Sequence, residues 1–398
     1  MKWVPSGSYL TINYNHEIGI IENSTQRIVL NNNLNGSKIR VRFSNKYSKE
    51  VLILNKVTVA VKNKYNDSRI NNYVNVTLNG DCDIKLNPGE ECFSDEILID
   101  VTSEDDLVIS TYIENKTVLY SACSTYCEDI ISISNSYEGD FTRHNDFEIK
   151  SQEDIFEVVK NDPGIMKPKL AYGINEIQVL VEDYVKVISA FGDSITHMSF
   201  WTGPFAKKLY NKYPGKVTIV NRGIGGNRIL RDPISNLGFP GDGRFCGEAG
   251  INRFEEDVFN GFEVDYVVIL EGINDIMHPF LFDRRDEIVN KNDLIKGFKI
   301  YADISKKYGA KVFIGTITPC RSDEYPWFEE IENTRLATNE WIRENDEYDG
   351  IIDFDSAVKD LNKSEYMKRT YHIGDGLHPN YDGGVQMAEC IPLELFNI

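Results

Sequence analysis

The hydrophobic pattern changes its period near residue 183. Up to that point apolar and polar residues alternate one by one, as in residues 38–43, 57–61 and 107–113. A period of two with one apolar face is typical of an antiparallel sheet that is wetted on its other face. Turn signals such as Asn87-Pro88-Gly89 separate these runs, and no long helical stripe interrupts them. We therefore predict an all-β sandwich domain over residues 1–183, with a jelly-roll-like arrangement.

From residue 184 onward, short apolar runs alternate with longer amphipathic ones. Strands are predicted at residues 185–191, 217–220, 266–270, 311–317 and 351–354, and helices near residues 205–213, 294–308, 329–344 and from 381 onward. Such alternation indicates an α/β domain over residues 184–398, in which a parallel sheet has helices on both faces. Ligands of these sheets bind at the carboxyl ends of the strands.

Two polar motifs follow the first two of these strands. Ser194, in the stretch GDSI, comes directly after the first strand and can present its hydroxyl at the sheet edge, although a serine there can also simply cap a helix. Residues 221–228 (NRGIGGNR) follow the second strand, and glycines let a backbone N–H approach a substrate closely. A phosphate loop is the alternative, but the spacing fits neither the dinucleotide fingerprint nor the nucleotide P-loop.

Two more motifs complete the set. Asn274 follows the third strand in the stretch EGIND, where its amide can donate to an oxyanion or only close a turn. Asp375 and His378 lie three residues apart before the last helix, so that the carboxylate can hold Nδ1–H while Nε2 faces a serine. Taken alone, that pair is also compatible with a cap and a surface histidine. The four motifs together, in this order, favour nucleophilic catalysis.

Size and charge narrow the class of protein. The chain has 398 residues, which suggests two domains, and its net charge of −19 argues against nucleic acid and anionic membranes as partners. No apolar run approaches the roughly 20 residues that span a bilayer. The first six residues lack the apolar core of a signal peptide, so we expect a cytoplasmic protein, although a trimmed chain would look the same.

The cysteine and histidine spacing predicts neither a metal nor a cofactor. The 7 cysteines form no paired CxxC knuckles, which favours free thiols in a reducing compartment, while a Cys82–Cys92 disulfide stays open. No metal-ligand spacing appears around the candidate site.

The residues of the second half resemble the SGNH hydrolase family, the GDSL-like esterases and lipases. Its four signature residues match Ser194, a glycine of the second motif, Asn274 and His378. The resemblance implies a flavodoxin-like three-layer α/β/α fold and a catalytic triad of Ser194, His378 and Asp375. It also implies an oxyanion hole formed by Ser194 N–H, Gly226 N–H and the Asn274 side chain.

The first half resembles the β-rich domain of a bacterial subgroup of these hydrolases, through residues 25–29 (TQRIV) and 36–45 (GSKIRVRFSN). Some of these relatives are described as carbohydrate or acetyl-xylan esterases. The resemblance therefore implies a serine esterase that removes short acyl groups from a small-molecule or oligosaccharide ester. Alternatives are a lysophospholipase or thioesterase with a longer acyl pocket, and a carbohydrate-binding protein without activity. The role of the first domain and a homo-oligomeric state stay open.

Four further polar residues are candidates for the substrate pocket: His197, Asn227, Arg228 and His278. His197 is a rival base, but on the same helical turn as the serine it is expected to point away or to line the pocket. Arg228 either forms a structural ion pair or contacts the substrate. His278 either lines the pocket or is simply exposed in its loop. The Gly- and Asp-rich stretch 233–250 is either a pocket wall or an ordinary surface loop.

Overall fold

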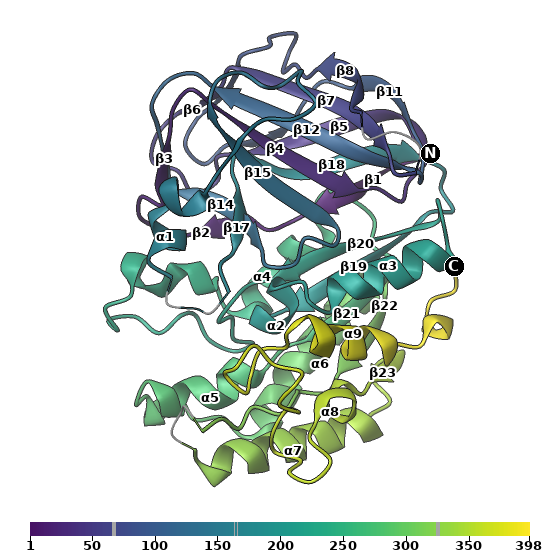
Figure 1. Ribbon diagram of the computed structural model, residues 1–398. Coiled ribbons are helices and arrows are strands. Elements are labelled where there is room, and N and C mark those ends of the chain that lie inside the picture. The colour runs from purple at the N-terminus through teal and green to yellow at the C-terminus, as the bar shows by residue number, and fades with distance from the viewer. Residues whose placement is uncertain (66–68, 163, 165, 324–326) are drawn as a thin grey trace. The chain divides into compact units, whose positions relative to one another are not determined.

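The computed structural model describes residues 1–65, 69–162, 164, 166–323 and 327–398. The chain forms two compact units, residues 1–185 with 209–220 and residues 186–208 with 221–398. Figure 1 labels their elements. A single domain boundary at residue 183 remains a proposal, since the segment 209–220 groups with the first unit.

Strands make up most of the first unit. They are β1 (Lys2–Ser8), β2 (Ile12–Asn13), β3 (Gly19–Ile21), β4 (Ser24–Asn31), β5 (Gly36–Ser44), β6 (Leu52–Leu54), β7 (Lys56–Asn63), β8 (Asn71–Asn75), β9 (Ile84–Leu86), β10 (Glu91–Phe93), β11 (Ile97–Val101), β12 (Asp105–Ile113), β13 (Thr117–Leu119), β14 (Ser121–Thr125), β15 (Ile131–Glu138), β16 (Ile149–Lys150), β17 (Lys169–Ala171) and β18 (Ile174–Val181). Two short helices, η1 (Gln152–Asp154) and α1 (Glu157–Lys160), precede β17.

Two antiparallel sheets carry the apolar core of this unit. One has the strand order β1-β18-β5-β10, with β11 also paired to β5, and the other has the order β16-β15-β4-β12-β7-β8. The alternation predicted from the sequence is confirmed, because Ile39 and Val41 of β5 are buried while the basic residues between them are partly exposed. Gly7 of β1 lies against Leu30 of β4, where a Cβ would come within 2.6 Å of the leucine side chain, so the two sheets pack face to face. The jelly-roll arrangement of their connections remains a prediction.

The remaining elements alternate between strands and helices. The strands are β19 (Lys186–Gly192), β20 (Val217–Gly223), β21 (Tyr266–Leu270), β22 (Lys311–Gly315) and β23 (Gly350–Ile352). The helices are α2 (Ser194–His197), α3 (Thr202–Lys212), η2 (Pro240–Cys246), α4 (Gly250–Phe259), α5 (Ile273–Leu281), η3 (Arg285–Glu287), α6 (Lys291–Lys307), α7 (Glu329–Glu344), α8 (Phe354–Val358), α9 (Tyr381–Glu389) and η4 (Leu393–Leu395).

The order of the sheet strands is β20-β19-β21-β22-β23, and β19, β21, β22 and β23 pair in parallel. Numbered along the chain, this is the order 2-1-3-4-5 of flavodoxin-like folds, as the resemblance implies. The order reverses between β19 and β21, so their carboxyl ends flank the crevice in which such folds bind ligands. Ser194 and Asn274 follow these two strands.

Aromatic contacts show that the second unit packs helices on both faces of its sheet. Phe191 of β19 packs against Phe254 of α4 and Tyr301 of α6, with ring centroids 4.9 and 5.3 Å away. On the other face, Phe396 contacts Phe313 of β22 at 5.2 Å and Phe205 of α3 at 5.6 Å. The expected α/β/α layering is therefore present.

One detail differs from the sequence-based picture. The strand predicted at residues 351–354 ends at Ile352, because the Asp353 side chain accepts a hydrogen bond from Ser356 N and starts α8 at Phe354. The stretch 233–250 contains the short element η2, in which Gly241, Asp242 and Gly243 have left-handed instead of helical backbone conformations. As the sequence favoured, Cys82 and Cys92 form no disulfide with each other. Among the described residues, no helix combines the length and apolar character needed to cross a bilayer.

Candidate active site

Ser194 lies at the turn between β19 and α2. Asp193 caps this helix, with its buried carboxyl accepting a hydrogen bond from Ile195 N at 3.0 Å. Gly192 makes the turn feasible, because a Cβ there would lie 2.0 Å from the Leu270 carbonyl oxygen at the end of β21. The close approach of the two strands therefore requires glycine, and it leaves the Ser194 side chain partly exposed at the sheet edge.

The structure brings Ser194, His378 and Asp375 into one hydrogen-bonded line. Ser194 Oγ is 2.8 Å from His378 Nε2, and His378 Nδ1 is 2.6 Å from Asp375 Oδ2. The second oxygen, Asp375 Oδ1, accepts the backbone N–H groups of Leu377 and His378, both at 3.0 Å. A carboxylate facing Nδ1 places the imidazole proton there, so that Nε2 is free to accept the serine proton.

Asp375 is held in its ionised form. Burial raises the pKa of this carboxyl, but the hydrogen bond from His378, its charge and the two backbone N–H groups lower the pKa further, so the net pKa lies below its usual value. His372 braces the same loop, because its Nδ1 accepts the N–H groups of Gly374 and Gly376 at 3.1 and 3.0 Å. The His378 ring and the Asp375 carboxylate are thus held in place by groups of the protein itself.

Two backbone N–H groups and one side-chain amide are the candidates for an oxyanion hole. Ser194 N–H is at the first position of α2, where no helical acceptor exists. Gly226 N–H, in a loop with φ +75°, and Ser194 N–H both find no acceptor among the residues that the structure describes. Asn274 Nδ2 donates to Asn227 O at 2.9 Å, which uses one of its two hydrogens and fixes the direction of the other. Unsatisfied donors of this kind are what an oxyanion hole requires.

His197 holds the glycine loop rather than the serine hydroxyl. Its Nδ1 accepts Gly225 N–H at 3.1 Å, so among the two loop glycines only Gly226 keeps its N–H for a ligand. A Cβ on Gly225 would lie 4.0 Å from the Ser194 Cβ, which places the loop directly beside the nucleophile.

The other candidate pocket residues differ in burial. Asn227 is only 1% exposed, and its Nδ2 donates to the carbonyl oxygens of Cys246 and Glu248, so both amide hydrogens are already used. Arg228 is buried in an ion pair with Glu287, at 2.5 Å, which is the structural alternative that the sequence left open.

His278 is half-buried beside the glycine loop. Its Cε1 lies 4.0 Å from the position that a Cβ on Gly226 would occupy. Burial, together with the charge of Arg228, lowers the pKa of this imidazole to about 3, so it is neutral at physiological pH. His278 therefore offers a neutral ring at the edge of the site.

Buried carboxyl groups stabilise the loops of the site by accepting hydrogen bonds from backbone N–H groups. Asp275 accepts the N–H groups of Ile229 and Leu230 at 2.7 and 3.0 Å, which anchors the segment after Gly226. Burial raises the pKa of Asp275 to about 6, although these hydrogen bonds partly offset the rise. For Asp193, burial and the nearby charge of Glu271 raise the pKa well above the usual range. Within the described part of the chain, no group of three or more His, Cys, Asp or Glu side chains is arranged to hold a metal.

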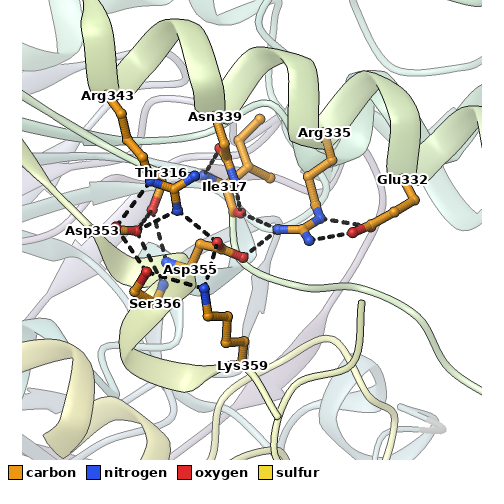
Figure 2. Close-up of polar contacts among 10 residues, drawn as sticks. All are labelled: Thr316, Ile317, Glu332, Arg335, Asn339, Arg343, Asp353, Asp355, Ser356 and Lys359. Carbon is orange, nitrogen blue, oxygen red and sulfur yellow. Dashed lines mark hydrogen bonds and ion pairs between the residues drawn. The ribbon is translucent and has the colours of Figure 1, made fainter. Parts of the chain in front are cut away.

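A polar cluster fixes the segment that follows β22 (Figure 2). Arg335 of α7 is fully buried and donates to Ile317 O at 3.0 Å and to Asp355 Oδ1 at 2.6 Å. Asn339, one turn further along α7, bonds both the N–H and the C=O of Ile317 at 2.8 Å. This segment then reaches the triad loop, since a Cβ on Gly376 would lie 2.8 Å from Arg321 O.

Two parts of the site were missed by sequence reasoning. Helix α4 was not predicted, although Ile251, Phe254 and Val258 recur with helical spacing. Its Arg253 contacts several site loops, as described below. Cys246 also escaped notice, and its Sγ lies against Gly226, where a Cβ would come within 2.5 Å of it. Burial raises the pKa of this thiol to about 12.

Comparison with known proteins gives the class of this one. Residues 190–384 match the model of the GDSL-like Lipase/Acylhydrolase family. The protein is therefore an acylhydrolase, an enzyme that hydrolyses ester bonds. More narrowly, it carries a domain of the GDSL-like lipase/acylhydrolase family at those residues, and a serine triad with an oxyanion hole follows from that membership.

Solved structures similar to this chain include an acetyl xylan esterase from Geobacillus stearothermophilus. The two sequences are 18% identical, the match covers 53% of this chain and 94% of that chain, and the TM-score is 0.40. A GDSL-like lipase from Bacteroides thetaiotaomicron matches with 19% identity, 53% and 87% coverage, and a TM-score of 0.37. A search of curated proteins gave no match.

Proposed function

We propose that the chain is a serine esterase that removes a short acyl group, such as acetyl, from a carbohydrate or a similar small ester. The observation that carries the proposal is the hydrogen-bonded line from Asp375 through His378 to Ser194 Oγ, at 2.6 and 2.8 Å. That line lies beside N–H donors without acceptors, which is the arrangement that two-step acyl transfer needs.

In the first step Ser194 Oγ attacks the ester carbonyl carbon while His378 Nε2 takes the hydroxyl proton. The new C–O bond makes a tetrahedral intermediate, whose negative oxygen accepts hydrogen bonds from Ser194 N–H, Gly226 N–H and the second amide hydrogen of Asn274. His378 then gives its proton to the leaving alcohol oxygen as the ester C–O bond breaks. Asp375 stabilises the imidazolium throughout without taking the proton.

The second step repeats this chemistry with water. His378 Nε2 removes a proton from water, whose oxygen attacks the acyl carbon bonded to Ser194. The same three donors hold the oxyanion, and collapse of the intermediate returns the proton to Ser194 Oγ and releases the acid.

The substrate part of the proposal depends on the resemblance to bacterial carbohydrate esterases through residues 25–29 and 36–45 and the catalytic motifs. The charge of the chain is compatible with a neutral alcohol part. The net charge of −19 disfavours polyanionic substrates. A jelly-roll-like first domain ending at residue 183 is part of the same proposal.

The test combines a substrate series with nucleophile labelling. We expect kcat/KM for 4-nitrophenyl esters to fall steeply from acetate to octanoate, and acetylated xylo-oligosaccharides to release acetate. Ser194→Ala should lose nearly all activity and resist labelling by a fluorophosphonate. A Ser194→Ala protein with full activity would exclude the mechanism. A preference for octanoate would show that the substrate carries a longer acyl chain, as for a lysophospholipase or thioesterase.

A further inference from the structure

Arg253 is a charged residue in the interior of the second unit. It lies in α4, and its side chain is only 6% exposed, with the guanidinium carbon 4.1 Å from the centre of the Phe191 ring. An arginine is rarely buried to this extent unless hydrogen bonds satisfy its charge and its donors. The partners of Arg253 therefore indicate what it does.

Those partners lie in the loops of the first two motifs. Arg253 Nη2 donates to Gly192 O at 2.9 Å, two residues before the nucleophile. Arg253 Nε donates to Asn227 Oδ1 at 2.8 Å, and Nη1 donates to Arg222 O at 3.0 Å, so both ends of the glycine loop are held. The remaining contact of Nη1 is with Asp257 of the same helix, at 2.8 Å.

Arg253 is linked in two ways to the third loop, which follows β21 and leads to Asn274. Arg253 Nη2 lies 3.7 Å from Glu271 Oε1, an oxygen that has no hydrogen-bond partner among the described residues. Glu271 precedes α5, where Asn274 is located. In addition, the backbone oxygen of Asn227 accepts one amide hydrogen of Asn274, so the residue that Arg253 holds also aims the third donor.

The contacts of Arg253 depend on the planar shape of its guanidinium group as well as on its charge. A guanidinium has five N–H donors in one plane, and here they reach four oxygens of hydrogen-bond partners plus the Glu271 carboxylate. A lysine would supply three donors at a single point and could not span the same oxygens. The contacts are thus specific to arginine.

We propose that Arg253 is a positioning residue, whose guanidinium ties together the three loops that carry the oxyanion donors. This inference rests on the proposed function, because it concerns the same site. Arg253 touches no reacting atom. It acts on the rate by holding the donors at the position where the oxyanion forms, and displacement of a donor by about 1 Å is enough to cost about 100-fold in rate.

The first experiment compares the same substitution at two buried arginines. Arg253→Lys should lower kcat for 4-nitrophenyl acetate about 10- to 100-fold with little change in KM, since the interactions lost are made in the transition state. Arg27→Lys is the matched control, because Arg27 is also buried and donates to Ser110 and to three backbone oxygens in the first unit. Arg27→Lys should keep kcat within about twofold at temperatures below its melting point.

The second experiment is a double-mutant cycle with Asn274→Ala. If Arg253 acts through the oxyanion donors, Arg253→Lys will cost several-fold less in kcat when Asn274 is already alanine. A purely structural role predicts equal costs in both backgrounds. Should Arg253→Lys fail to fold, Asn227→Ala removes the acceptor at the other end of the link and should give the same loss of kcat at constant KM.

The outcomes separate the inference from the function it rests on. Fully additive costs, or an unchanged kcat in both Arg253→Lys and Asn227→Ala, would overturn the role of Arg253 while leaving a Ser194-dependent esterase intact. Activity that survives Ser194→Ala would instead overturn the proposed function itself.

Discussion

Replacing Asp375 by asparagine should disable the base while preserving the loop. The asparagine side chain would keep an oxygen for the N–H groups of Leu377 and His378, which Oδ1 now accepts at 3.0 Å. At the position of Oδ2, however, an N–H₂ group would face His378 Nδ1 at 2.6 Å. Two donors repel each other there, so the imidazole is expected to move its proton to Nε2.

The expected loss follows from the tautomer. With a proton on Nε2, the atom 2.8 Å from Ser194 Oγ can no longer accept the hydroxyl proton. The analogous change in another serine hydrolase lowers kcat by about 10⁴, which corresponds to about 5.4 kcal/mol of transition-state stabilisation. Because Asp375 faces His378 Nδ1 in the same role, we expect a loss of the same order.

The assay is steady-state hydrolysis of 4-nitrophenyl acetate at neutral pH, with thermal unfolding measured in parallel. Asp360→Asn is the matched control, since Asp360 Oδ1 also accepts two backbone N–H groups, at 2.8 and 3.1 Å, and neither belongs to a histidine of the site. The control should keep full activity. If Asp375→Asn remained within tenfold of the wild-type kcat while folded, the assignment of the orienting carboxylate would be refuted.

Four further outcomes are expected. Asn274→Ala should stay folded and lose about 10²–10³-fold in kcat, and a smaller loss than tenfold would remove its amide from the oxyanion hole. His197→Ala should lose less than tenfold, because its Nδ1 is used by the glycine loop; a 10³-fold loss would make it the base. Arg335→Ala should lower the urea midpoint of unfolding by the equivalent of about 3–5 kcal/mol, because Arg335 is fully buried. Arg343→Ala should lower the midpoint clearly less, because the Arg343 side chain is 34% exposed. Equal effects of the two substitutions would contradict the burial argument. Burial raises the pKa of Glu271 to about 7 in the folded protein, whereas its value in the unfolded chain is about 4.3. The stability of the wild-type protein therefore declines as the pH rises from about 4.3 to about 7, so Glu271→Gln should gain stability relative to the wild type between pH 5 and pH 8. A difference in urea midpoint that stays constant over this pH range would disprove the expectation.

Local patterns in the sequence predicted most of the catalytic unit. Residues 266–270 and 329–344 have the predicted bounds, because a run of apolar residues and an amphipathic stretch each determine an element without distant help. The parallel direction of the sheet strands followed from the strand–helix alternation. The pairing of Ser194 with His378 came from the order of the motifs and the resemblance they carry.

What the sequence did not predict depends on contacts between distant residues. The partners of Arg253 lie 61 residues away at Gly192 and 26 residues away at Asn227, so no local period marks them. Helix α5 has only nine residues and a proline inside, and the motif that it carries looks like a turn. Phe354 extended an apolar run beyond its strand, because the cap at Asp353 outweighs the hydrophobic pattern.

Ser194 and His378 are 184 positions apart, and Asn274 lies between them. During synthesis the nucleophile and every oxyanion donor leave the ribosome well before the base does. A chain that stops short of Asp375 would carry a serine that no group activates, so partly made or C-terminally clipped copies are expected to be silent toward esters in the cell. Hydrolysis then reports that the polypeptide has been synthesised past His378.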